Sequence, residues 1–535
     1  MLESASPGVR AIQRAYEGVG AWTLLVMPFS NLFMSWGVMA LAVVGLIDFW
    51  DRRRTGRGTQ ALHAGALGNR PLWVLPLAFF AWQALGLCWT DDLRQGWAVL
   101  RMQLPLVIFP LVWLNGRVDV EGWKRRWPIY FASGVALACV IVLIRGYLGG
   151  NSLKPRDWSP FISHIRFNLM IVWAWTWWTW QALSQRGPRW VPVVLGLLGG
   201  WVIWKTASLT GALLLPVLAA VLLLGYLRNR WPERRNRWRL GALGCFLLLG
   251  GGVGWVIHDL KPRHPEPADY PTHSRDGEVY VHRWNRTLRE NGHYVWTCVA
   301  ENELAQAWQL RTGRPLSGKD GRGQNLRMTL IRYLTSVGRT KDAQGVEELT
   351  EDDVARVESG IPTINEVEKR GLARRWNVIR FEYWNYLDGG NPSGHSVIQR
   401  LAFLEAGEHI LRGHLLWGVG TGDLPRAFSQ AYEAIGSRLS PVFRLRAHNQ
   451  FLTLWLATGP LALLLWLSWL IAAVGKPRTN RMHAFLFVLI LSLSCLTEDT
   501  LETQAGVTFA GFFLALLSDR RSAAQGTQKR AERKR

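Results

Sequence analysis

The chain has 535 residues, of which 49% are apolar, and it carries a formal net charge of +23 at pH 7. Its 31 tryptophans exceed ordinary usage, and Trp is favoured where a membrane meets water. The basic residues bunch in short loops between apolar runs, which indicates membrane orientation and argues against nucleic acid as a partner.

A helix needs about 20 apolar residues to cross a bilayer. The first apolar run, 18–50, is too long for one span and is interrupted at Pro28-Phe29-Ser30-Asn31, which predicts a tight helical hairpin. Further runs lie at 71–88, 98–115, 128–148, 161–182, 190–206, 208–227, 240–258, 450–474, 483–498 and 504–518. The predicted fold is an all-α polytopic membrane protein with about 12 transmembrane helices.

The loops between these runs alternate in charge. The basic set is 51–58, 117–127, 184–189, 228–239, 476–481 and the tail, whereas the opposite set holds few basic residues and comprises 28–31, 90–94, 151–158 and 497–502. Because basic loops stay in the cytoplasm, both termini are predicted to be cytoplasmic and the long polar stretch to lie outside. The first run continues into further spans, so we expect it to remain as an anchor.

This topology divides the chain into four parts. They are N-terminal transmembrane helices (1–258, about nine of them), an extracytoplasmic loop domain (259–447), about three C-terminal transmembrane helices (448–518) and a basic cytoplasmic tail (519–535). The loop is long enough to fold, and the three/four apolar spacing in 396–413 predicts that it is mainly helical. It contains a single cysteine, Cys298, so no disulfide is expected there.

Polar side chains gather at the predicted outer face. They are Ser163, His164 and Arg166 at the start of one span, Lys205 and Ser208 at an outward turn, Arg444, Arg446 and His448 where the long loop returns, and Glu498, Asp499 and Glu502 at the last turn. Polar groups at membrane depth are costly, so their convergence points to a functional site. A structural interpretation is the alternative, in which Lys205 extends toward lipid headgroups and the carboxylates pair with Arg.

The segment RLRAHNQFLTLWLATG resembles the signature of the O-antigen ligase and polymerase superfamily, through His448, Asn449, Leu452 and Gly459. Upstream, Arg400 and the phrase GHLLWGVGTGD, with Gly418, Gly420 and Asp423, resemble the Arg-containing helix and Gly-rich phrase of that family. Leu415 stands where the family usually has Pro. Segments 330–361 and 497–513 are similar to the subset with a long periplasmic loop.

The resemblance implies a glycosyltransferase in the bacterial inner membrane with its active site facing the periplasm. Its donor would be a glycan on polyprenyl (undecaprenyl) diphosphate, and its acceptor lipid A-core or another glycan or protein. His448 would be the general base, since His titrates near neutral pH. Arg400 would clamp the leaving diphosphate with paired hydrogen bonds. No metal or other cofactor is expected. The candidate substrate-binding residues are Arg446, Arg166, His164, Lys205, Asn449, Gly420 and Asp423.

One departure concerns the diphosphate. Many ligases carry a Ser-Arg pair at an outward turn in mid-chain, whereas this chain reads SLTG there, with Leu209 at the Arg position. Lys205 or Arg166 is the candidate replacement for that charge.

Alternative functions remain. A polymerase that extends the lipid-linked glycan and a protein O-oligosaccharyltransferase share these motifs. A transporter or flippase belongs to a different class, which often shows internal repeats and charges at mid-membrane. The sequence has no detectable repeat and its polar groups lie near one face, which favours an enzyme.

Overall fold

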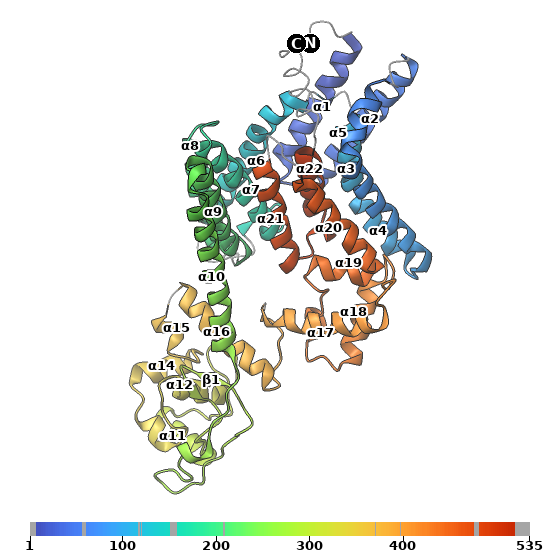
Figure 1. The fold of residues 1–535 in the computed structure, drawn as a ribbon. Coiled ribbons are helices and arrows are strands. Elements are labelled where there is room, and N and C mark those ends of the chain that lie inside the picture. Colours follow the sequence, from blue (N-terminus) through green and yellow to red (C-terminus); the bar gives the residue numbers. More distant parts are fainter. Residues whose placement is uncertain are drawn as a thin grey trace. The chain divides into compact units, whose positions relative to one another are not determined.

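The computed structural model of the chain describes residues 7–55, 60–115, 118, 120–149, 158–206, 209–369, 371–395, 397–475 and 481–518. These residues are mostly helical (Figure 1) and belong to two compact units. Unit 1 is Met1–Cys245, Ala406–Ile435 and Leu445–Arg535, and unit 2 is Phe246–Glu405 and Gly436–Arg444. The predicted loop domain, 259–447, therefore does not coincide with unit 2, because 406–435 packs within unit 1. The predicted tail lies outside the described residues.

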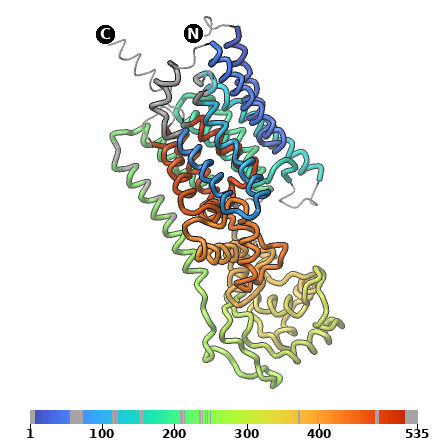
Figure 2. Tube along the Cα trace, turned by 90° about the vertical axis from the view of Figure 1, so that its right-hand side faces the viewer, coloured from blue at the N-terminus to red at the C-terminus, as the bar shows by residue number. Residues whose placement is uncertain are grey.

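Most helices of unit 1 are apolar and run along a common direction in Figure 2. Its helices are α1 (Pro7–Val26), α2 (Asn31–Arg54), α3 (Gln60–Leu85), α4 (Leu93–Gln103), α5 (Pro105–Asn115), α6 (Val120–Gly149), α7 (His164–Leu183), α8 (Trp190–Lys205), α9 (Leu209–Arg230), α18 (Leu424–Ala434), α19 (Gln450–Thr458), α20 (Pro460–Val474), α21 (Arg481–Thr497) and α22 (Gln504–Ser518). Short 3-10 helices are η1 (Gly86–Trp89), η4 (Pro232–Arg234) and η7 (Thr500–Glu502). Two helices, α10 (Arg235–Leu260) and α17 (Ile398–Gly413), contain residues of both units.

The predicted break in the first apolar run is confirmed. Helix α1 ends at Val26, and Ser30 caps α2 by accepting a hydrogen bond from the Phe33 amide at 3.4 Å. Every other predicted apolar run also contains helix. Four helical stretches of the described chain are long and apolar enough to cross a membrane, namely Asn31–Arg54, Leu93–Trp113, Arg125–Gly149 and Arg239–Leu260, and shorter apolar helices accompany them. These helices are typical of a membrane protein.

The core of unit 1 joins the two ends of the sequence. Trp127 of α6 lies against Trp177 of α7, with ring centroids 4.4 Å apart, and against Phe513 of α22, at 5.0 Å. All three rings are buried. Helix α22 packs on α5, and α21 packs on α7. Because α21 and α22 are anchored in this way, the turn between them comes next to the first turn of α7.

Unit 2 has a separate core around Trp308, Tyr333 and Leu334, all fully buried. Its elements are η5 (Pro267–Asp269), β1 (Arg289–Glu290), β2 (His293–Tyr294), α11 (Glu301–Thr312), α12 (Leu326–Ser336), α13 (Ala343–Glu347), α14 (Glu351–Glu358), α15 (Asn365–Glu368), α16 (Gly371–Leu387) and η6 (Pro441–Phe443). Its helical character agrees with the prediction for the loop. Cys298 is a free thiol here, as are Cys88, Cys139 and Cys495 in unit 1.

Candidate active site

Arg166, in the first turn of α7, ties that helix to the turn between α21 and α22. Its Nη1 lies 3.2 Å from Oε2 of Glu498, its Nη2 donates to the Asp499 carbonyl at 2.9 Å, and its Nε donates to Thr503 Oγ1 at 3.4 Å. The two side chains of the ion pair are only 7% and 4% exposed. The sequence named Arg166 as a substrate ligand. In the structure all three of its guanidinium nitrogens contact protein groups, and its role toward a substrate stays a prediction.

His448 lies beside the same carboxylates. Its backbone has φ of +47°, a left-handed conformation that is uncommon outside glycine and costs about 1–3 kcal/mol. Its amide donates to Asp499 Oδ2 at 3.2 Å, and its Nδ1 is 3.6 Å from Glu498 Oε2. The other Asp499 oxygen accepts from Thr453 Oγ1 at 2.7 Å. Glu498 therefore stands between Arg166 and an imidazole whose side chain is 30% exposed.

Helix α19 follows directly and explains the position of His448. Asn449 is its N-cap, accepting from the Leu452 amide at 3.1 Å and donating to the Leu496 carbonyl at 3.3 Å. Both polar groups of this predicted substrate ligand thus bind the protein. The helix ends at Gly459, whose φ is +79° and where a Cβ would collide with the Leu416 carbonyl. The motif residues therefore start and stop one nine-residue helix.

Arg446 supplies a partly exposed positive charge near His448 in the sequence. Its Nη1 lies 2.8 Å from Oε2 of Glu502, and the Arg446 side chain is 31% exposed while that of Glu502 is 6% exposed. Burial raises the pKa of Glu502, although the positive charge of Arg446 opposes the shift. Unlike Arg166, this guanidinium binds a single protein group among the described residues, the Glu502 carboxylate, so its remaining N–H groups can be offered to a substrate.

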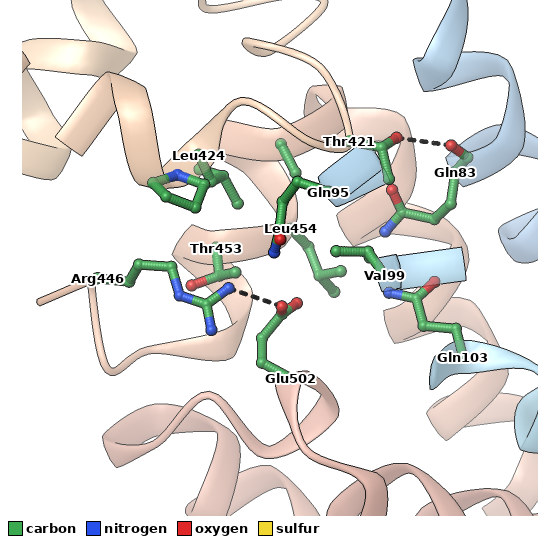
Figure 3. A pocket seen from close by; sticks show the side chains of 12 residues that line it. Gln83, Gln95, Val99, Gln103, Thr421, Leu424, Arg446, Thr453, Leu454 and Glu502 are labelled. Atoms are coloured by element: carbon green, nitrogen blue, oxygen red, sulfur yellow. Dashed lines mark hydrogen bonds and ion pairs between the residues drawn. The ribbon is translucent and has the colours of Figure 1, made fainter. Parts of the chain in front are cut away.

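Beside Arg446 and Glu502 lies a small pocket of about 10 Å³, room for about one water molecule (Figure 3). Its polar lining includes Gln83, Gln95, Gln103 and Thr421. The Thr421 hydroxyl donates to the Gln83 carbonyl at 2.6 Å. Sequence reasoning did not select the three Gln residues. The sequence pattern could have identified them, since each is an uncharged polar residue in or beside an apolar run, where polar groups are costly.

The Gly-rich loop GVGTGD holds α19 and α4 in place. Val419 and Gly420 donate their amides to the Leu456 and Ala457 carbonyls, both at 2.8 Å, which satisfies the C-terminal end of α19. The buried Asp423 carboxylate accepts the amides of Asp91 at 2.7 Å and Asp92 at 3.0 Å. Gly420 and Asp423 were predicted to bind substrate. A nine-residue helix needs partners for its last carbonyls, and the loop uses its polar groups there.

Lys205 and His164 are further candidates on helices α8 and α7. Lys205 ends α8 with its Nζ 5.3–5.7 Å from the ring centroids of three tryptophans, Trp158, Trp201 and Trp204, a cation–π arrangement. His164 is the partly buried first residue of α7. Ser208, in the turn with the Leu209 departure, lies outside the described residues.

Arg400 lies near the start of α17, in the part of that helix that belongs to unit 2. His448 belongs to unit 1. The role of Arg400 as the diphosphate clamp therefore stays a prediction.

Within the described part of the chain, no group of three or more His, Cys, Asp or Glu side chains could hold a metal ion. Comparison with protein-family models finds no match, and comparison with curated proteins finds none either.

Proposed function

We propose that the chain is an O-antigen-ligase-like glycosyltransferase that moves a glycan from a polyprenyl diphosphate to lipid A-core or a similar acceptor. The observation that carries the proposal is His448, a strained residue just before α19 with a buried carboxylate, Glu498, 3.6 Å from its Nδ1. A base oriented by a carboxylate is the arrangement that activates a hydroxyl nucleophile. His448 also belongs to the sequence motif that resembles the ligase family.

In this mechanism Glu498 holds the imidazole with Nδ1 toward the carboxylate and leaves Nε2 for the acceptor. As the acceptor oxygen attacks the anomeric carbon, Nε2 takes its proton, and the bond from that carbon to the diphosphate oxygen breaks. The diphosphate leaves with the electron pair. Glu498 then stabilises the imidazolium. Arg166 acts through Glu498 as a positioning residue.

Because no metal is expected, a positively charged side chain must stabilise the negative charge of the leaving diphosphate. Arg166 does not serve, because Glu498 neutralises it in a nearly buried pair. Arg446, which is 31% exposed, and Arg400 are the proposed clamps. A guanidinium presents two parallel N–H groups to phosphate oxygens, whereas an ammonium is a point charge.

Replacement of Arg400 by Lys is expected to lower turnover nearly as much as replacement by Ala, because the planar fork is lost although the charge is kept. Turnover of lipid-linked glycan in detergent measures this. Arg412→Lys, at an exposed position of the same helix where Arg412 pairs with Glu408, is the matched control and should remain active. Full activity of Arg400→Lys would show that any positive charge suffices.

We also propose the finer topology of about 12 spans in a bacterial inner membrane, with both termini cytoplasmic. The charge alternation of the short loops supports it. The transmembrane transporter alternative is less favoured, since the ionisable cluster at His448 lies at helix ends and interhelical turns rather than at mid-helix.

Reconstitution tests the proposal. Purified protein in proteoliposomes receives undecaprenyl-diphosphate glycan together with lipid A-core, and the products are read by mass. A ligase yields glycan on the acceptor, whereas a polymerase yields longer lipid-linked glycan and a protein O-oligosaccharyltransferase modifies only an added protein acceptor. Movement of intact lipid-linked glycan across the bilayer without any transfer would refute the enzyme.

A further inference from the structure

A second charged cavity lies entirely within unit 2, apart from the residues assigned to catalysis. It has a volume of about 110 Å³, whereas one water needs about 10–15 Å³ of such space. A polyatomic anion therefore fits. The lining includes Asp259, Arg263, Arg289, Arg380 and Trp384.

The cavity has an excess of positive charge that the protein leaves uncompensated. Asp259 is taken by Arg380, whose Nη1 lies 3.2 Å from it, and by the Trp376 indole N–H at 2.8 Å. Arg263 and Arg289 have no ion pair among the described residues. Glu290, the chain neighbour of Arg289, accepts instead from Arg332 Nε at 2.7 Å.

Arg289 is built into a rigid position. It begins β1, and the turn Asn291-Gly292, with φ of +49° and +95°, is the two-residue turn that an Asn-Gly pair favours in a hairpin. The guanidinium carbon lies 4.2 Å from the centroid of the Trp384 ring. Its Nε is buried and bonds to no described residue. Burial lowers the pKa of Arg289, and the charges of Arg263 and Arg380 lower it further, whereas Tyr294 and Asp259 act in the opposite direction. An anion in the cavity would reduce the repulsion among the three Arg side chains.

The cavity lies at the C-terminal end of α10. His258 and Asp259 are near the last residue of the candidate membrane span Arg239–Leu260. Apolar side chains on the unit 2 part of this helix are exposed, namely Phe246, Leu247, Leu248, Val253 and Ile257. Trp255 and Trp376 lie together near the same end, with ring centroids 5.4 Å apart, as expected where a span leaves the hydrocarbon. At that level a membrane presents its phosphate groups.

We propose that this cavity, formed by Arg263 and Arg289 beside the end of α10, binds a phosphate group of a phospholipid headgroup. The site would hold unit 2 to the membrane surface where α10 emerges. Arg supplies the forked donors that phosphate oxygens accept. The proposal requires α10 to cross the membrane but is independent of glycosyl transfer, so the two can fail separately.

The test uses the full-length protein in detergent, stripped of lipid and titrated with phosphatidylglycerol, with binding read by native mass spectrometry. Diacylglycerol, which has the same tails without phosphate, and glycerol phosphate, which has no tails, are the comparison probes. We expect phosphatidylglycerol to bind more tightly than either. Arg289→Gln and Arg263→Gln should each weaken it about tenfold, the effect of losing one charge-assisted hydrogen bond.

Arg275→Gln is the matched control, because Arg275 is an exposed Arg of unit 2 that pairs with Glu347 away from the cavity. Arg263 is exposed, so its variant keeps the test valid even if Arg289→Gln lowers stability. Glycerol phosphate that binds as tightly as phosphatidylglycerol, with the same loss in both variants, would keep the phosphate site and refute the lipid source. Equal phosphatidylglycerol binding by wild type and both variants would overturn the site.

Discussion

Replacement of His448 by Gln or Asn is expected to lower turnover by about 10²–10⁴, the usual contribution of general acid–base catalysis. Both amides keep hydrogen-bonding groups but cannot take a proton at neutral pH. Asn also tolerates the left-handed backbone that the structure records at this position, φ of +47°, so loss of activity in His448→Asn cannot be attributed to backbone strain. Turnover of lipid-linked glycan and thermal unfolding of the same preparations are the measurements.

His409→Gln serves as the matched control, because His409 is exposed on α17. It should leave turnover unchanged. The rival role for His448 is structural, through its backbone amide on Asp499, which every substitution retains. A stable His448→Asn variant with wild-type turnover would therefore remove His448 as the base, whereas a stable, inactive variant that still binds the donor would support it.

Arg166→Gln is expected to destabilise the protein by about 3–5 kcal/mol, since it removes the guanidinium that neutralises the buried Glu498 carboxylate. The change also breaks the hydrogen bonds from α7 to the Asp499 carbonyl and Thr503. Chemical unfolding in mixed micelles measures the free energy of unfolding. Turnover should fall as well, because Glu498 no longer has the partner that holds it beside His448.

The control is Arg189→Gln, at an exposed position just before α8. It should be close to neutral. The double variant Arg166→Gln, Glu498→Gln should recover part of the lost stability, since the buried carboxylate charge is removed together with the guanidinium. An Arg166→Gln variant as stable as the Arg189→Gln control would contradict the account of Arg166 as a buried tether.

Local features of the molecule were predictable because they depend on short stretches of sequence. The run 18–50 exceeds one span and contains Pro28, so the break that the structure places between Val26 and Asn31 follows from length and turn chemistry. The Arg446, His448 and Glu502 group was expected at one face because each lies at the end of an apolar run.

The division into folded units was not predictable in the same way. Residues 406–435 are polar enough to read as part of the outer loop, yet they belong to unit 1. Their loop amides meet the carbonyls at the end of α19, and Asp423 meets the amides of Asp91 and Asp92, more than 300 residues earlier. Hydropathy measures each segment alone and carries no record of such partners.

By itself, the sequence determined the apolar helices, the hairpin near Pro28 and the set of charged residues from which a site can be built. Only the tertiary structure decided how those charges are shared, with Arg166 neutralised by Glu498 and Arg446 held by Glu502 while still partly exposed. The physical reason is that helix formation follows from nearby residues, whereas the role of an ionisable side chain depends on burial and on the partner that packing brings within a few ångströms.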